Sequence, residues 1–335
     1  MKCRPLLLAV FLGFVLPGIM LYIAEKYFFS LELKNSIANT QPPYIQSTNE
    51  PLSSSEGYDA DSVIQIPVLF KDGTVKNIGL EDYILSVVLR EMPADFEVEA
   101  LKAQAVVART YALRLLNHSV KHLNGVVCTD SNCCQGYCSP DEYIDSGGQQ
   151  MLLEKVADAV RRTENLVLVY NGDLIEATYF SCSGGKTEDA AAVWGAEVPY
   201  LISTDSPGEE SAAHYISTVV TTKAQVAALL GFELQGVADP WIGEITYTSG
   251  GGVDSIEICG QVYKGTYIRR QLGLRSTAFT ITAVGDSVTI TTKGFGHRVG
   301  MSQYGAEAMA VKGSKFDEIL KHYYKDVELA HYICK

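Results

Sequence analysis

Positive charge is scarce in this chain of 335 residues. It carries 27 Lys and Arg against 39 Asp and Glu, which gives a net charge of −12. A protein that binds nucleic acid needs basic groups to neutralise phosphates, so this balance argues against a nucleic-acid partner. It also disfavours adhesion by charge to anionic lipid or teichoic acid. An uncharged or weakly charged ligand is the better match.

A cleavage signal is also missing after the apolar run near the start. Residues 5–23 (PLLLAVFLGFVLPGIMLYI) contain no charged residue and follow Lys2 and Arg4. Such a run is just long enough to cross ~30 Å of hydrocarbon as a helix. Because no small-x-small motif follows, we expect an uncleaved anchor, with a cleaved signal peptide as the alternative. The flanking basic residues orient the N-terminus to the cytoplasm, which predicts a single-pass membrane protein with an extracytoplasmic domain.

The sequence predicts three segments. Residues 1–24 form a cytoplasmic stub and transmembrane anchor, 25–62 a flexible extracytoplasmic linker, and 63–335 the folded domain. The linker is rich in Ser, Asn, Thr and Pro and cannot bury enough apolar surface to fold. In the folded domain, strands and helices segregate without regular βαβ alternation, which favours the α+β class with mixed or antiparallel strands.

An Ala-rich run over residues 99–116 predicts a central helix, because alanines on one face let other elements approach closely. Other helices are expected near 80–92, 151–164, 221–230, 265–272, 301–311 and 315–325. Strands are expected at 63–70, 166–170 and 175–180 and through most of 242–292.

One carboxylate lies where a helix must stop. The residue before a proline is pushed out of the helical region, so the helix over 80–92 should end at Met92, before Pro93. Glu91 then lies in the last turn, where the helix dipole disfavours an ionised carboxylate and desolvation raises its pKa. A carboxyl that stays protonated near neutral pH can serve as a general acid. Arg90 would oppose this if it turned inward.

Four motifs follow one another along the chain. They are LREMPADF (89–96), YFSCSGGKTE (179–188), Trp194-Gly195 with Pro199-Tyr200-Leu201, and GFGHRVGMSQYGA (294–306). Together they resemble the SpoIID (stage II sporulation protein D) family of bacterial peptidoglycan lytic transglycosylases, over about residues 64–324. The resemblance implies an active-site cleft between lobes and cleavage of the MurNAc-β-1,4-GlcNAc bond in peptide-stripped glycan, with 1,6-anhydroMurNAc ends as products.

The same resemblance implies a role for Glu91 as the catalytic acid/base. One carboxylate suffices because the sugar's own C6 hydroxyl attacks C1, whereas ordinary glycosidases need two carboxylates. Strand alternation puts Tyr179, Ser181 and Ser183 on one side of their stretch. By resemblance the substrate-binding set comprises Arg109, Gln104, Tyr179, Ser181, Ser183, Gly184, Gly185, His297, Ser302, Gln303 and Tyr304.

The glycine-punctuated loop departs from the family at one position. Gly294, Gly296 and Gly300 are expected to adopt backbone angles closed to other residues. Arg298 stands where the family has glycine after the histidine. A side chain there would be strained if the position requires a positive φ. We assign His297 to the cleft lining without a chemical role.

Four cysteines crowd into residues 128–138. Crowding favours a metal, although disulfides are possible in an exported domain. Some SpoIID proteins hold zinc here with two Cys and two His, which implies the ligands His122, Cys128, Cys134 and, in place of the second histidine, Cys133. Four ligands make a structural site, whereas three leave an open catalytic position. With Cys3 set aside because it lies at the membrane edge, Cys138, Cys182, Cys259 and Cys334 remain and allow three pairings.

The resemblance also implies a cellular setting. It predicts sporulation, with engulfment of the forespore from the mother-cell membrane, a partner amidase (stage II sporulation protein P) and a membrane scaffold. Related proteins include amidase enhancers, so a non-enzymatic glycan-binding amidase activator on the same fold is the main alternative. A zinc hydrolase such as an amidase is a third hypothesis, and it would require an open metal site.

Overall fold

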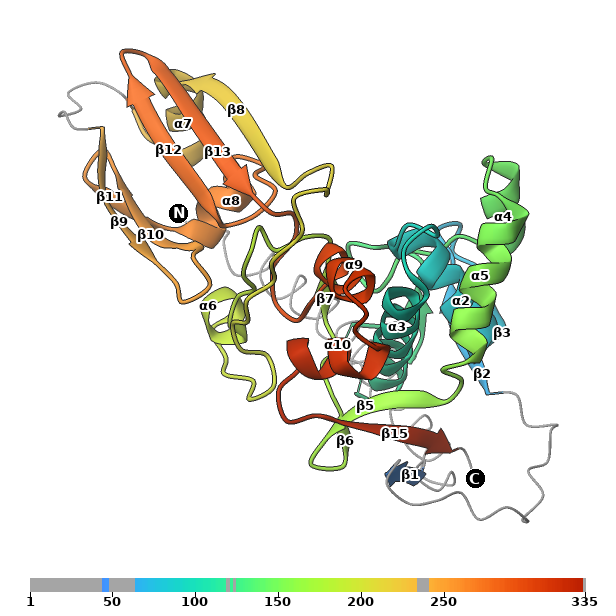
Figure 1. The fold of residues 1–335 in the computed structure, drawn as a ribbon. Coiled ribbons are helices and arrows are strands. Elements are labelled where there is room, and N and C mark those ends of the chain that lie inside the picture. Colours follow the sequence, from blue (N-terminus) through green and yellow to red (C-terminus); the bar gives the residue numbers. More distant parts are fainter. Residues whose placement is uncertain (1–43, 48–63, 119–120, 123–124, 234–240, 334–335) are drawn as a thin grey trace, which may run out of the picture. The chain divides into compact units, whose positions relative to one another are not determined.

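The computed structural model describes residues 44–47, 64–118, 121–122, 125–233 and 241–333 (Figure 1). The chain divides into two compact units, Met1–Tyr44 with Ile333–Lys335 and Ile45–Tyr332, and nearly all described residues belong to the second. The predicted anchor lies outside the described residues, and of the predicted linker only β1 (Tyr44–Ser47) lies within them. No helix in the described part combines the length and the apolarity needed to cross a bilayer.

Two helices from the most informative part of the sequence form as expected. α2 (Leu80–Glu91) ends at Met92, whose extended angles (φ −126°, ψ 140°) follow from the proline after it. α3 (Val98–His118) is the Ala-rich helix, with 21 residues. It packs against α2, β5 (Leu166–Tyr170), α5 (Gln150–Arg161), α9 (Gln303–Val311) and α10 (Phe316–Tyr323).

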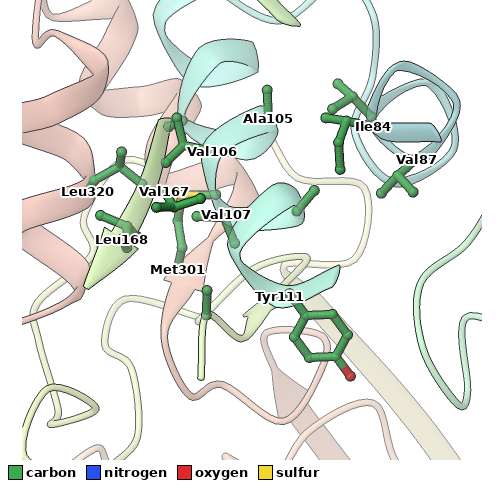
Figure 2. Packing of buried hydrophobic residues seen from close by; sticks show 14 of the residues in the cluster. Ile84, Val87, Ala105, Val106, Val107, Tyr111, Val167, Leu168, Met301 and Leu320 are labelled. Carbon is green, nitrogen blue, oxygen red and sulfur yellow. The ribbon is translucent and has the colours of Figure 1, made fainter. Parts of the chain in front are cut away.

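The larger core surrounds α3. Figure 2 shows Val106 and Val107 of α3 close to Val167 and Leu168 of β5, with Leu320 of α10 beside them. These side chains are fully or almost fully buried. The small residues predicted on α3 therefore allow helices and a strand to approach it from several sides.

Short strands surround this core. β2 (Gln65–Leu69) pairs antiparallel with β3 (Val75–Gly79) and parallel with β4 (Val127–Cys128). β5 pairs antiparallel with β6 (Asp173–Leu174) and with β15 (Glu328–Ile333). The strand expected over 175–180 is wrong in extent, because only β7 (Tyr179–Phe180) forms there. β7 pairs in parallel with β14 (Met301–Ser302), which brings two of the sequence motifs side by side.

The described residues of 216–233 and 241–293 form a second lobe with its own apolar cluster, which we call the accessory lobe. Val226, Trp241, Ile256, Ile268 and Ile290 are among its buried residues. The lobe contains two three-stranded antiparallel sheets, in the orders β12-β13-β8 and β11-β10-β9. Their bounds are β8 (Ile216–Thr222), β9 (Ile242–Tyr247), β10 (Val253–Ile258), β11 (Gln261–Lys264), β12 (Phe279–Val284) and β13 (Ser287–Lys293), with helices α7 (Lys223–Leu230) and α8 (Gly265–Gln271).

Two short helices were not expected from the sequence, α4 (Pro140–Asp145) and α6 (Ala190–Trp194). α4 begins with a complete capping box, in which Ser139 and Glu142 satisfy each other's backbone N–H groups. α6 ends at Gly195, which adopts the left-handed conformation (φ +76°) typical of a helix terminus. The cleft between lobes that the resemblance implies stays a prediction.

Candidate active site

Glu91 lies half-buried in the last turn of α2. The backbone N–H of Gly136 donates a hydrogen bond to its Oε1 at 2.5 Å. Burial raises the pKa of Glu91, while the Gly136 N–H and the charge of Arg90 lower it by less. The carboxyl is therefore biased toward its protonated form and keeps one donor ready to stabilise the ionised form.

Gly136 approaches Glu91 so closely that no side chain fits. A Cβ at this position would lie 2.6 Å from Cγ of Arg90 and 2.8 Å from Oε1 of Glu91. Sequence reasoning missed this residue. The available signal was a glycine two positions after Cys134, at the end of the cysteine-rich segment.

The sequence analysis also missed the neighbouring Gln135, whose side chain links its own segment to Tyr179 and to α3 by hydrogen bonds. It is almost fully buried, and its Oε1 accepts a hydrogen bond from the Tyr179 phenol at 3.1 Å. Its Nε2 donates to the carbonyl of Ala108 in α3 at 3.3 Å. Burial, followed by the charge of Glu91, raises the pKa of Tyr179 well above its usual value. Tyr179 is thus a neutral phenol close to Glu91.

The start of α9 meets the end of α2. Nε2 of Gln303 donates to the backbone carbonyl of Glu91 at 2.9 Å and lies 3.4 Å from Oε1 of Gln104. Both glutamine side chains are buried, and among the described residues Nε2 of Gln104 has no hydrogen-bond partner. The structure thus brings Glu91, Gln104, Tyr179 and Gln303 together, although they come from four separate segments.

Ser302 and Tyr304 have structural contacts. Ser302 is fully buried and caps α9, because its Oγ accepts a hydrogen bond from the Gly305 N–H at 3.2 Å. The backbone N–H of Tyr304 donates to the carbonyl of half-buried Ser181 at 3.0 Å. Its ring packs edge-on against Phe96 at 5.1 Å. These contacts fix the loop and the helix that carry Gln303.

The Ser183 hydroxyl is engaged inside the protein rather than facing a ligand. Ser183 is fully buried, and its Oγ donates to Oε2 of Glu209 at 2.9 Å. The backbone N–H groups of Ser183 and Gly184 donate to the same oxygen at 2.7 and 2.9 Å. The predicted alternation fails here because β7 ends at Phe180, and Cys182 and Ser183 are both buried.

Glu209 was missed by the sequence analysis and organises this turn. Its Oε1 accepts a further hydrogen bond from the Ser206 hydroxyl at 2.6 Å. A Cβ at Gly305 would lie 2.8 Å from that oxygen and 2.0 Å from the Tyr323 hydroxyl, so the glycine of the 303–306 motif makes room for this cluster. Gly184 and Gly185 adopt positive φ values of 79° and 113°, as the turn requires.

Arg109 does not turn toward Glu91. Its fully buried guanidinium donates to both carboxylate oxygens of Glu81, at 2.9 and 2.5 Å, and to the carbonyl of Leu166 at 3.1 Å. The predicted contact with substrate is therefore corrected to an ion pair that joins α3 to the first turn of α2. Helix periodicity could not distinguish these two directions.

His297 is held neutral. Burial, with a smaller effect from the charge of Arg269, lowers its pKa to about 4. Its Nδ1 accepts a hydrogen bond from the Val299 N–H at 3.1 Å, and its ring lies between Phe180 and the partly exposed Trp194, with centroids 5.6 and 5.5 Å away. The environment suits a packing role, in line with the absence of a chemical role in the sequence analysis.

Arg298 adopts a positive φ (68°), the condition under which the sequence analysis expected strain at this position. Its buried guanidinium pairs with Glu188 at 3.0 Å and donates at 2.7 Å to the carbonyls of Gly250 and Lys186, while its Nε donates to the carbonyl of Ser183. These bonds offset the backbone strain, which costs about 1–2 kcal/mol. The loop glycines 294, 296 and 300 all have positive φ, which confirms their prediction.

The cysteine-rich segment forms a cluster that can hold a metal ion. One ligand atom from each of His122, Cys128, Cys133 and Cys134 lies within 4.8 Å of the others. Nε2 of His122 is 3.4 and 3.5 Å from the sulfurs of Cys133 and Cys134. Tetrahedral zinc with ordinary bond lengths separates nitrogen and sulfur ligands by about 3.5 Å. The donor set and its spacing therefore fit a four-coordinate metal.

The other cysteines form no disulfide within the described part of the chain. Cys138, Cys182 and Cys259 are free thiols there, and Cys334 lies outside the described residues. Burial raises the pKa of Cys182 to about 11, so this thiol is chemically inert near neutral pH.

Known proteins resemble this chain over most of its length. The family described as "SpoIID: Stage II sporulation protein" matches residues 71–170. Stage II sporulation protein D of Bacillus subtilis (strain 168) is 39% identical over 303 residues, covering 89% of this chain and 88% of the relative. The protein of that name from Bacillus amyloliquefaciens is 38% identical over 306 residues, covering 89% and 88%. The amidase enhancer of B. subtilis is 29% identical over 299 residues, covering 73% of this chain and 40% of the enhancer.

The likeness to the two sporulation proteins thus extends through almost nine tenths of both chains. Because it is this extensive, the chain belongs to the SpoIID (stage II sporulation protein D) family.

Proposed function

We propose that this protein is a peptidoglycan lytic transglycosylase in which Glu91 is the single acid/base. The substrate would be peptide-stripped glycan, cut at the MurNAc-β-1,4-GlcNAc bond. One observation carries the proposal: a half-buried carboxyl at the end of α2, with its pKa raised by burial and one oxygen held by the Gly136 N–H. This combination suits a group that gives up a proton and then recovers it.

The proposed reaction uses Glu91 twice. In its protonated form, Glu91 donates a proton to the glycosidic oxygen as the bond to C1 breaks. The C6 hydroxyl of MurNAc then attacks C1 and gives its proton to the Glu91 carboxylate. The product is a 1,6-anhydro end, and no water is consumed. The Gly136 N–H would stabilise the carboxylate between the two steps, because hydrogen bonds to charged acceptors are stronger.

The residues around Glu91 hold it and its hydrogen-bond donor in place. Gln303 holds the backbone of Glu91, and Gln135 links the Gly136 loop to Tyr179. Gln104 is fully buried and contacts Gln303, so we assign it a supporting role. We assign substrate contact to the exposed atoms of Tyr179 and Ser181, and a supporting role to the rest of the predicted set.

We propose zinc as the metal of the cysteine cluster, in a structural role. His122 and the three cysteine sulfurs would complete a tetrahedron and leave no open position for a reacting water. Cys134 lies two residues before Gly136, so a bound zinc would fix the segment that supports Glu91. This arrangement disfavours a zinc hydrolase.

The cellular setting is part of the proposal. The relatives named stage II sporulation protein D support a role in sporulation. We extend this role to engulfment of the forespore on the family resemblance. The apolar residues 5–23 support a single-pass anchor in the mother-cell membrane, with the domain on its outer side, facing the forespore. We expect a cell-wall amidase, stage II sporulation protein P, and a membrane scaffold as partners.

Digestion of peptide-stripped glycan by the wild type and by Glu91→Gln tests the chemistry. Mass analysis should find anhydro ends with the wild type and none with the variant. Reducing ends would identify a hydrolase. Activity that survives in Glu91→Gln would exclude the proposed acid/base.

The amidase enhancer relative favours a second candidate, a glycan-binding activator of an amidase. On that alternative, the wild type leaves glycan uncut and stimulates an added amidase, and Glu91→Gln stimulates it equally. A loss of both cutting and stimulation in the variant would favour the enzyme.

A further inference from the structure

The cysteine-rich side of the metal cluster has no basic residue of its own. Residues 126–138 contain Asp130 but no Lys or Arg. Cys128 and Cys134 of the cluster are buried, while His122 and Cys133 are half-buried. A metal-bound cysteine is a thiolate, and a metal-bound histidine is neutral. Three thiolates, one imidazole and a divalent zinc ion therefore leave one net negative charge in a partly buried place.

A charge in such a place costs free energy unless it is compensated. Removal from water disfavours a charged group that lacks an opposite charge or hydrogen-bond donors nearby. A set of two cysteines and two histidines around zinc is neutral and avoids this cost. This chain has a third cysteine instead, so a cation close to the cluster would stabilise the loaded site.

Lys121, the residue before the candidate ligand His122, provides such a cation. Its Nζ donates hydrogen bonds to the backbone carbonyl of Cys133 at 2.7 Å and to the phenol of Tyr111 at 2.8 Å. The ammonium also lies over the Tyr111 ring, 5.4 Å from its centroid. It interacts electrostatically with both Cys133 and Cys134. The positive charge thus lies beside two of the three candidate thiolates.

The ammonium group is held in place although Lys121 as a whole is exposed. A surface lysine usually stays mobile, because fixing its long side chain costs conformational entropy. Here Tyr111, a buried residue of α3, and the Cys133 carbonyl hold the charge from two sides. Such fixation gains most where a negative charge lies next to it, because the attraction between opposite charges grows as their distance shrinks.

We propose that Lys121 supplies the counter-charge of the metal cluster and thereby raises its affinity for zinc. The inference rests on the structural zinc site proposed above and adds a residue outside the four ligands. Loss of a group that supports the ligands from outside the coordination sphere typically lowers metal affinity by about 10- to 100-fold. Because solvent reaches Lys121, its contribution lies at the lower end of this range.

The zinc affinity of the full chain in detergent micelles, measured by competition with a chromophoric chelator, tests the proposal. Lys121→Gln should raise the zinc dissociation constant about tenfold at low ionic strength, and by less at high salt. Lys121→Arg keeps the charge and should bind zinc nearly as tightly as the wild type. Lys312→Gln, at an exposed position at the end of α9, is the matched control and should leave the affinity unchanged.

Cys133→His separates the effect of charge from that of architecture. This variant makes the ligand set neutral, so the addition of Lys121→Gln to it should change the zinc affinity little. A lysine that only held the Cys133 carbonyl in place would cost the same affinity in both backgrounds. An equal loss in the two backgrounds therefore overturns the proposal.

The absorption spectrum of the cobalt-loaded protein shows whether the ligands themselves are kept. Co²⁺ bound by thiolates absorbs strongly, and its bands should be the same in the wild type and in Lys121→Gln. A changed spectrum would mean that the variant loses a ligand, which overturns the counter-charge role. Wild-type affinity in Lys121→Gln overturns it as well and leaves the zinc site standing, whereas a wild type that binds no zinc overturns both.

Discussion

Glu91 and Glu209 both accept a hydrogen bond from the backbone N–H of a glycine, but they differ in burial and in the number of hydrogen bonds they accept. Glu209 is fully buried and accepts four hydrogen bonds, shared between its two oxygens. Glu91 is half-buried, and Gly136 donates to one of its oxygens. Several donors hold the Glu209 carboxylate in one position, whereas Glu91 has one donor and a pKa that burial raises. The number of donors therefore separates a structural carboxylate from a candidate catalyst.

The two segments that serve these carboxylates differ in the same way. The Ser183–Gly184 turn surrounds Glu209 and belongs to a motif that resembles the family, yet its contacts are internal. The Gln135–Gly136 segment supports Glu91 and lay outside the recognised motifs. Membership of a recognised motif is thus a poor guide to which residues face a ligand.

The largest expected effect is on the rate of cleavage in Glu91→Gln. Loss of a general acid/base lowers a rate by about 10²- to 10⁴-fold. The amide oxygen of glutamine can still accept the Gly136 N–H, so the melting temperature should barely change. The rate is measured on peptide-stripped glycan, with exposed Glu154→Gln as the control. A large drop in stability would mean that Glu91, like Glu209, is structural.

Glu209→Gln should show the reverse pattern. The new NH₂ group of glutamine is a donor and would face the hydrogen-bond donors of the Ser183–Gly184 turn. Because this breaks a buried hydrogen-bond network, the free energy of unfolding should fall by about 3 kcal/mol. Denaturant unfolding measures it, and the exposed neighbour Glu210→Gln is the control. If both variants unfold at the wild-type midpoint, the carboxylate does not hold the turn.

His297 should make the fold sensitive to acid. Its pKa is about 4 in the folded protein, against 6.5 in a free side chain, so the unfolded state binds a proton more readily between these values. The free energy of unfolding should therefore fall as pH drops between these two pKa values. We expect a loss of about 2 kcal/mol, which is less than the full pKa difference would give, because solvent screens the half-buried ring. Urea midpoints at pH 7 and pH 5 should differ more in the wild type than in His297→Gln.

Gly136→Ala should lower activity more than stability. The added Cβ would displace the side chains of Arg90 or Glu91, and a small misplacement of a catalytic group costs roughly tenfold or more in rate. Gly148→Ala is the control, because the atoms nearest its Cβ belong to the Tyr143 ring rather than to Glu91 or Arg90. Equal rates in Gly136→Ala and the wild type would remove Gly136 from the site.

The smallest effect concerns Arg90. Its charge lowers the pKa of Glu91, so Arg90→Gln should raise that pKa. Glu91 must be protonated to donate, and activity is lost as pH rises through its pKa. The alkaline limb of the kcat/KM profile should therefore move to higher pH, and less so at high salt. Arg162→Gln, at an exposed position that follows α5, should leave the limb in place.

Local sequence rules predicted the helices well and the side-chain directions poorly. Pro93 fixed the end of α2, and the Ala-rich face predicted the central packing of α3, because both depend on short-range geometry. The same reasoning predicted the wrong direction for the Arg109 side chain, because its partner Glu81 is 28 residues away in the chain. It also extended β7 too far, since strand length depends on the pairing with β14.

The sequence by itself determined where α2 stops, that Glu91 lies in its last turn, and that the loop glycines need positive φ. These features follow from constraints within a few residues, whereas the four metal-ligand candidates came from the family resemblance. Only the tertiary structure decided three contacts. The Gly136 N–H donates to Glu91, the Gln303 side chain donates to the backbone carbonyl of Glu91, and the Ser183 hydroxyl donates to Glu209. Such contacts join segments far apart in the sequence, and the packing around α3 selects them because buried polar groups must find partners.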